Sequence, residues 1–151
     1  MTEVSQLMKH NTDTINLIKT TRKLYNTIDT NYKNKSIIGW EHELSKKELD
    51  MFVKLNASDS DTLLIKDLKA IDRFLNKVLV IELTQNQYNA LVSLVYDIGF
   101  AAFRRSELLA AINNNKLESV PQYFKRWNTY LKLPIYRLTK VRKIEIELFT
   151  K

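Results

Sequence analysis

The residues best suited to chemistry in the first third of the chain are two glutamates, Glu41 and Glu43. A pair of carboxylates can serve general acid and base catalysis, and glycoside hydrolysis in particular. On one β-strand the two would face the same side, with Cα atoms about 6.6 Å apart. That spacing is in the inverting range, but neighbours on one strand approach a bond from one side instead of flanking it. From Val4 to Trp40 the only acids are Asp13 and Asp29.

The stretch that organises the rest of the chain runs from Leu83 to Phe103 and predicts one buried helix. Thr84 and Gln87 form a capping box at its start. An apolar stripe at helical spacing follows, made of Ala90, Leu91, Leu94 and Val95. Gly99 is predicted to stop the helix as a left-handed (αL) residue.

This stretch resembles a run found in phage-type lysozymes, the muramidase endolysins. That run is similar to Leu-Thr-x-x-Gln-x-x-Ala-Leu-Val-Ser-Phe-x-Phe-Asn-x-Gly-x-x-x-Phe. The matching residues here are Leu83, Thr84, Gln87, Ala90, Leu91, Val92, Ser93, Gly99 and Phe103. Later landmarks of the family follow in the same order: Ser106-x-Leu108-Leu109, Asn113, Gln122-x-Phe124-x-Arg126-Trp127, Leu138 and Arg142-x-x-Glu145. The resemblance covers most of residues 13–149.

Active members of that family carry a Glu at the end of the first helix, an Asp nine residues on and a Thr six beyond it. The Thr leads into Thr-Ile-Gly-Tyr-Gly-His. Here residues 17–19 resemble the lead-in to the Glu, and residues 38–42 resemble the end of the motif. The resemblance therefore places Arg22, Asn31 and Ile37 at the three catalytic positions, with the spacing kept and all three residues replaced.

The replacements remove the chemistry that the family needs. A guanidinium stays protonated and has no acceptor lone pair, so Arg22 can act neither as general acid nor as general base. Asn31 could orient a water only weakly, and Ile37 cannot do so. General acid catalysis alone is worth about 10² to 10⁴ in rate. The family's glycines are also depleted, because Lys23, Asn34 and Glu41 stand at three of their positions and Gly39 alone remains.

The former cleft is predicted to contain His42, Glu41, Arg142 and Glu145, because the family's Glu pairs with a basic residue of the last helix. Two guanidiniums, Arg22 and Arg142, would repel each other in one partly buried cleft unless a carboxylate intervenes. We expect Glu41 or Glu145 to compensate Arg22. The alternative is that Arg22 swings into solvent and needs no partner.

Composition limits the classes of protein and partner. The chain has 151 residues, no cysteine, 44% hydrophobic residues and a net charge of +7. It is long enough for one domain with a core of its own, and no apolar run approaches a membrane span. The positive charge favours an anionic partner, but scattered basic residues without a nucleic-acid motif argue against nucleic acid. We expect a soluble protein without export signal or anchor, made in the cytoplasm and reaching the periplasm only through a holin.

The predicted fold is α+β and mainly α, a two-lobed lysozyme-like fold in one domain, residues 1–151. Residues 1–12 form an extension in which Val4, Leu7 and Met8 can pack on the body. A helix capped by Asp13 or Thr12 follows, then short strands from Leu24 to Trp40. We expect a small antiparallel sheet between about residues 24 and 43, within a small lobe of about 13–57. Ser45 and Glu48 form a second capping box, which favours a helix although the family segment is irregular.

The remaining residues are predicted to be helical. The pattern of Leu64, Leu68, Ile71, Leu75 and Val78 gives a long helix of about 58–80 that connects the lobes. Residues 81–151 form a helical lobe, with Ser106 and Ser119 capping shorter helices and a last helix from Leu138 or Val141 to Phe149. Phe124 and Trp127 are interpreted as core and not as a ligand platform. The full predicted core is Leu64, Leu68, Ile71, Leu91, Leu94, Val95, Phe103, Phe124 and Trp127.

The function predicted from these features is that of a catalytically inactive lysozyme-like protein of phage or prophage origin. It would bind the glycan strand of peptidoglycan or an unidentified protein, without cofactor or metal. The alternative is an active muramidase that lyses the host through non-standard residues. The sequence leaves the oligomeric state open.

Overall fold

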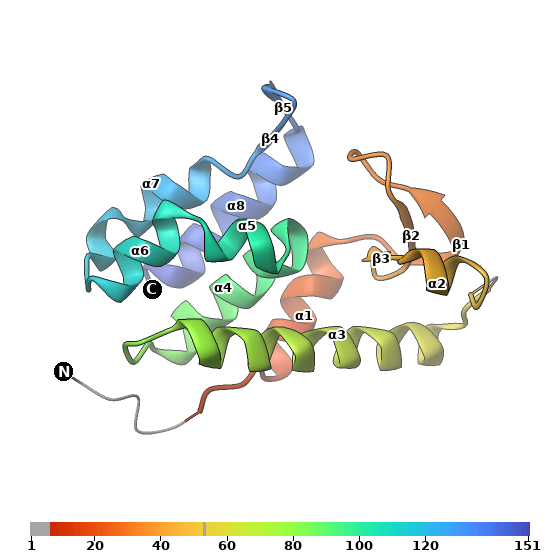
Figure 1. Cartoon of the computed structure of the whole chain (residues 1–151), viewed down its shortest axis with the longest axis horizontal. Coiled ribbons are helices and arrows are strands. Elements are labelled where there is room, and N and C mark those ends of the chain that lie inside the picture. Colours follow the sequence, from red (N-terminus) through yellow and green to blue (C-terminus); the bar gives the residue numbers. More distant parts are fainter. Residues whose placement is uncertain (1–6, 53) are drawn as a thin grey trace.

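The computed structural model describes residues 7–52 and 54–151 and shows the predicted two-lobed, mainly helical fold (Figure 1). The small lobe contains α1 (Thr12–Thr21), β1 (Tyr25–Thr30), β2 (Ser36–Gly39), β3 (His42–Glu43) and α2 (Lys46–Leu49). The long helix α3 (Ala57–Val78) joins it to α4 (Gln85–Ile98), α5 (Phe100–Arg104), α6 (Glu107–Asn113), the 3₁₀ turn η1 (Leu117–Ser119), α7 (Val120–Lys125), β4 (Thr129–Tyr130), β5 (Leu133–Pro134) and α8 (Tyr136–Phe149).

Helix α4 forms where its capping signals place it. The Thr84 side chain accepts from the Gln87 amide, and the Gln87 side chain accepts from the Thr84 amide. Gly99 ends the helix with φ 83° and ψ 170°, so it has the predicted positive φ but not the αL conformation. It also occupies the position before α5, a short helix that the sequence analysis did not predict.

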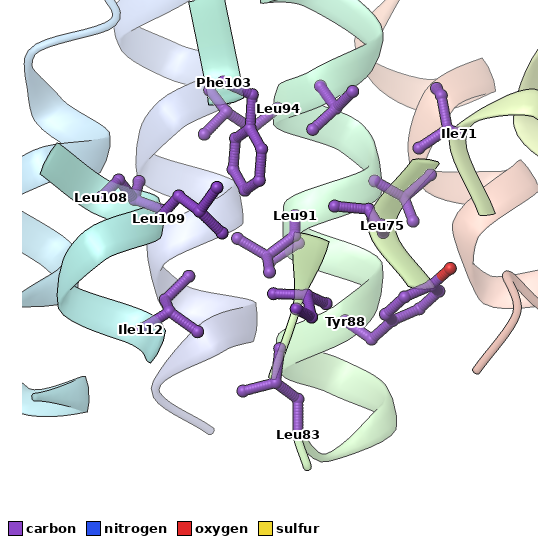
Figure 2. Close-up of a cluster of buried hydrophobic side chains, with 14 of the residues drawn as sticks. Ile71, Leu75, Leu83, Tyr88, Leu91, Leu94, Phe103, Leu108, Leu109 and Ile112 are labelled. Atoms are coloured by element: carbon purple, nitrogen blue, oxygen red, sulfur yellow. The ribbon is translucent and has the colours of Figure 1, made fainter. Parts of the chain in front are cut away.

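The main core lies around α4, with α1, α3, α5, α6, α7 and α8 contributing side chains. Figure 2 shows the part of this core in which Leu91 of α4 lies among side chains of α3, α5 and α6. Eight of the nine predicted core residues are buried, and Trp127 packs against the core while remaining partly exposed. A smaller cluster of Ile38, Leu55 and Leu63 lies under the sheet of the small lobe. That sheet is antiparallel in the order β1-β2-β3, within the predicted range of 24–43.

Several local predictions were wrong or incomplete. Asn11, and not Thr12 or Asp13, caps α1. Ser119 forms no side-chain cap, because its hydroxyl donates to the Lys116 carbonyl. Helix α8 begins at Tyr136, ahead of the predicted start, and the β4–β5 hairpin was not predicted.

The extension ahead of α1 is tied to the body in part. Met8 packs against the core and its amide donates to the Asn76 side chain, whereas Leu7 is exposed. The predicted packing of Val4 lies outside the described residues. Among the described residues, no helix combines the length and apolar character needed to cross a membrane.

Candidate functional site: a buried charge cluster beside the cleft

Arg22 lies at the C-terminal end of α1 and points into the body of the protein. Its side chain is fully buried, so the alternative in which Arg22 reaches solvent is wrong. Its Nη1 donates to the Ser93 hydroxyl at 2.9 Å, and its Nη2 donates to the Ser93 carbonyl at 2.8 Å. The guanidinium also lies 5.5 Å from the centre of the Tyr96 ring. These contacts fix the guanidinium against α4.

The carboxylate that compensates Arg22 belongs to Asp97, on α4. Arg22 Nη2 lies 2.9 Å from Asp97 Oδ1, and Arg142 Nη2 donates to Asp97 Oδ2. Arg142 Nε in turn lies 2.7 Å from Glu145 Oε1. Asp97, which was not among the predicted partners, bridges both guanidiniums. Of the two acids predicted to compensate Arg22, Glu145 acts on it only through its charge, and Glu41 pairs with Arg137 instead. We call Arg22, Asp97, Arg142 and Glu145 the buried charge cluster.

Burial and charge oppose each other within this cluster. Burial raises the pKa of Asp97, but the charges of Arg22 and Arg142 together lower it by more than burial raises it. The net pKa of Asp97 is therefore below its ordinary value. For Glu145 burial dominates over Arg142 and Arg22 and raises the pKa to about 7. Burial lowers the pKa of Arg22, and Asp97 more than offsets it, so the net pKa is raised. Asp97 is therefore a stable carboxylate between two cations.

The sequence carries a signal for Asp97 in the family run. In the family run quoted above, Asn precedes x-Gly, and this chain has Asp97 at that place, two residues before Gly99. Where the family run has a neutral Asn, this chain has an acid, and that acid forms the ion pair with Arg22. Sequence distance favoured Glu41, but the contact joins the end of α1 to the last turn of α4.

Asn31 and Ile37 both stabilise the small sheet, Asn31 in a turn and Ile37 as a buried residue of β2. The Asn31 side-chain carbonyl accepts from the amides of Lys33 and Lys35, at 2.9 and 3.0 Å, which closes the turn between β1 and β2. Its amide donates to Glu43 at 3.1 Å. Ile37 is 1% exposed on β2. The Asn31 side chain is thus engaged by the turn and by Glu43, and the buried Ile37 side chain has no polar atom.

Glu41 and Glu43 do not share a strand, so that expectation was wrong. Glu41 lies in the turn between β2 and β3 with φ 61°, and Glu43 lies on β3. Glu41 accepts from the Lys23 amide at 2.8 Å and pairs with Arg137 of α8 at 3.4 Å. Lys33 Nζ lies 2.5 Å from Glu43, and donates to the Asp97 carbonyl at 3.3 Å. The Glu41–Arg137 ion pair and the contacts of Lys33 with Glu43 and with the Asp97 carbonyl therefore cross the cleft.

His42 faces two carboxylates at the cleft. Its Nδ1 lies 2.6 Å from Asp67 and its Nε2 lies 2.9 Å from Glu48. Burial lowers the pKa of His42, but the hydrogen bond and charge of Asp67 and those of Glu48 outweigh it, and the net pKa is raised. His42 therefore links the sheet to α3 and to α2.

A cavity of about 390 Å³ lies between the lobes next to these groups. Its walls come from the turns before and after β2, from β3 and α3, and from the end of α4 and the start of α5. It is lined by Lys33, Glu41, His42, Glu43, Asp67, Ala70, Ile71, Val95, Tyr96, Asp97, Ile98, Gly99 and Phe100. The lining combines polar and charged side chains with aromatic and aliphatic ones, as small-molecule sites do. In the part of the chain that the structure describes, no group of three or more His, Asp and Glu side chains could hold a metal ion.

Comparison with known proteins agrees with this geometry. The family model "Phage lysozyme" matches residues 21–145. The endolysin of Bacillus phage PZA is 33% identical over 121 residues, which cover 76% of this chain and 44% of that protein. The endolysin of Salmonella phage P22 is 32% identical over 89 residues, 59% of this chain and 61% of that protein. The match thus spans less than two thirds of either relative.

Solved structures give the same result for the fold. The muramidase domain of SpmX from Asticaccaulis excentricus superimposes with a TM-score of 0.82 and 28% identity, over 95% of this chain and 98% of that one. A mutant of P22 lysozyme superimposes with a TM-score of 0.76 and 24% identity, over 95% and 99% of the two chains. Because the family model extends from the end of α1 to α8, the chain belongs to the phage lysozyme family.

Proposed function

We propose that this protein binds the glycan of peptidoglycan without cleaving it. The observation that carries the proposal is the state of Arg22, at the position where the family places its catalytic glutamate. Its guanidinium is buried and held by Asp97 and Ser93. The Arg22 side chain therefore cannot rotate away to let a neighbouring carboxylic acid take its place. A proton donor to a leaving glycosidic oxygen is therefore missing there.

The other carboxylic acid of the cluster does not replace it. Glu145 has a pKa raised to about 7, a value suited to a general acid. It is nevertheless 0% exposed and lies against Arg142, so no substrate can reach it. Its raised pKa reflects burial in the core of the lobe.

The cavity supports glycan binding on geometric grounds. It has room for about one sugar unit, and its carboxylates are hydrogen-bond acceptors for sugar hydroxyls. Phe100, at its edge, is 42% exposed and stacks on Phe74 with ring centres 4.5 Å apart. An exposed ring backed in this way is a rigid surface for the apolar face of a sugar.

The competing proposal is a muramidase that uses Glu41 and Glu43. Both glutamates line the cavity, which is the observation in its favour. Each is already held in an ion pair, with Arg137 and Lys33, so neither side chain can act on a substrate without breaking that pair.

One pair of measurements separates the two proposals. Purified protein is mixed with insoluble Gram-negative peptidoglycan between pH 4 and 8, and both turbidity and the sedimented fraction of protein are followed. We expect constant turbidity together with sedimentation. Lysis that disappears in Glu41→Gln/Glu43→Gln would establish the enzyme instead, and a protein that stays in the supernatant would overturn glycan binding.

Two variants with the same added volume test where the glycan binds. Ala70 lines the cavity, and Ala70→Phe should fill part of it and weaken sedimentation. Ala110 is exposed on α6 away from the cavity lining, and Ala110→Phe should bind as the parent does. Equal binding by both variants would place the glycan elsewhere.

Restoring Arg22→Glu, Asn31→Asp and Ile37→Thr together should recover only a trace of lysis, because the cleft glycines are also missing.

A further inference from the structure

The β4–β5 hairpin carries large apolar side chains that the protein leaves in water. Leu131 is 77% exposed, Leu133 is 67% exposed, and Tyr136, at the start of α8, is 79% exposed. Figure 1 shows this hairpin projecting from the helical lobe above the start of α8. We call these three residues the apolar tip. Neighbouring exposed apolar side chains of this size mark interaction surfaces more often than scattered single ones do.

The turn of the hairpin is built from residues that do not suit its backbone. Tyr130 pairs with Leu133, which leaves Leu131 and Lys132 as a two-residue loop. Their φ values are 51° and 68°. Positive φ at both central positions is the type I′ turn, for which Asn-Gly is favoured. Strain of this kind is kept where the surroundings use the side chains, so the exposed Leu131 and Lys132 are candidates for function.

One strand of the hairpin is anchored next to the turn, and the other is left free. The Tyr130 ring packs edge-on against Tyr32 of the small lobe, with ring centres 5.7 Å apart. Its cross-strand partner Leu133 has no comparable cover and stays exposed. The tip is therefore presented on a supported hairpin.

Cations surround the apolar tip. Lys132 lies in the turn, and Lys140 and Lys143 lie four and seven residues after Tyr136 on the exposed side of α8. The Nζ of Lys140 lies 5.5 Å from the centre of the Tyr136 ring. The sequence has no Asp or Glu from 119 to 144.

The arginines of this segment are already neutralised, and these lysines are not. Arg126, Arg137 and Arg142 pair with Glu107, Glu41 and Glu145. Among residues 7–52 and 54–151, no carboxylate forms an ion pair with Lys132, Lys140 or Lys143. Their charges are available to an anionic partner.

The shape and size of this surface favour a lipid bilayer over a folded protein. A stable protein interface buries about 800 Å² on each partner, which three side chains on a projecting hairpin do not supply. Shallow insertion of a few apolar residues, with lysines on anionic headgroups, needs no such area. We propose that this hairpin and the first turns of α8 dock on an anionic membrane, with Leu131, Leu133 and Tyr136 inserted and Lys132, Lys140 and Lys143 on the headgroups.

Sedimentation with sucrose-loaded vesicles tests the proposal on the full chain. The vesicles contain phosphatidylcholine with about one third phosphatidylglycerol, which supplies the negative surface. We expect binding that weakens at least about tenfold at about 1 M NaCl, where the screening length is about 3 Å. Binding of the protein to pure phosphatidylcholine vesicles should be as weak as its binding to the anionic vesicles at high salt. Equal binding to both vesicle types, or none to the anionic ones, would overturn the proposal.

Matched variants separate insertion from general basicity. Leu131→Ser/Leu133→Ser should lose at least about tenfold in vesicle binding, because insertion of apolar area is removed. Met51→Ser/Val80→Ser removes two other exposed apolar side chains, 70% and 53% exposed, and should bind as the parent does. Equal losses in the two pairs would refute a role for the apolar tip.

A third variant excludes misfolding as the cause. Leu131→Asn/Lys132→Gly supplies the residues that a type I′ turn favours. It should raise the melting temperature and weaken vesicle binding at the same time. A more stable variant that binds vesicles as well as the parent would also overturn the proposal.

Discussion

Arg22 Nη2 lies 2.9 Å from Asp97 Oδ1, and the two side chains are 0% and 8% exposed. This ion pair joins the end of α1 to the last turn of α4, beside the cavity between the lobes. Because Asp97 also accepts from Arg142, one carboxylate forms ion pairs with two buried cations. The arrangement makes the cation at position 22 compatible with the lysozyme-like core, and it yields the first prediction.

Asp97→Asn should destabilise the protein by about 3 to 5 kcal/mol, because it leaves Arg22 and Arg142 buried without their shared carboxylate. Urea unfolding followed by circular dichroism measures the free energy of unfolding. Arg22→Glu/Asp97→Asn is the control, since Glu at position 22 can pair with Arg142 as the family resemblance implies. The double variant should be more stable than Asp97→Asn alone. A loss below about 1 kcal/mol in Asp97→Asn, as for an exposed pair, would contradict the prediction.

The free energy of unfolding should fall as pH rises from about 4.3 to about 7, on the order of 3 kcal/mol. The pKa of Glu145 is raised to about 7 in the folded protein, so folding favours its protonated form. Ionisation is then easier in the unfolded chain, and stability is lost over this range. His42 acts in the same direction above its ordinary pKa of about 6.5, because its folded pKa is raised and its contribution is lost as it deprotonates. Asp97, with a lowered pKa, contributes stability that is lost only in more acidic solution.

Two variants test whether Glu145 and His42 cause this change of the free energy of unfolding with pH. Glu145→Gln should flatten the dependence between about pH 4.3 and 7, and His42→Gln should flatten it above about pH 6.5. Only the slope with pH is compared, because each substitution also changes contacts. A Glu145→Gln variant with the parent's slope would show that Glu145 is not the group that titrates.

Glu41→Gly should change the free energy of unfolding by less than about 1 kcal/mol. The substitution removes a partly exposed pair with Arg137, worth about 0.2 to 1 kcal/mol, and relieves a residue held at φ 61°. Glu41→Ala removes the same pair and keeps the unfavourable backbone, so it should be about 1 to 2 kcal/mol less stable than Glu41→Gly. Chemical unfolding of both variants under one condition gives the comparison. Equal stabilities would show that the backbone at Glu41 is not strained.

The sequence alone determined the elements whose signals are local. Thr84 and Gln87 cap α4, and the leucine pattern of α3 produced a helix within two residues of its predicted ends. Capping and periodicity depend on residues three or four apart, which the chain order fixes. The resemblance of the stretch from Leu83 to Phe103 and of the landmarks after it also gave the right family.

Only the tertiary structure decided which charges meet. Arg22 and Asp97 are far apart in the chain, and their contact depends on how α1 packs on α4 and α8 on both. Distance along the chain instead favoured Glu41, which the turn between β2 and β3 directs toward Arg137. The β4–β5 hairpin was missed for a similar reason, because Leu131 and Lys132 carry none of the Asn or Gly residues that mark such a turn. Long-range packing holds charges and a strained turn in places that local preferences do not predict.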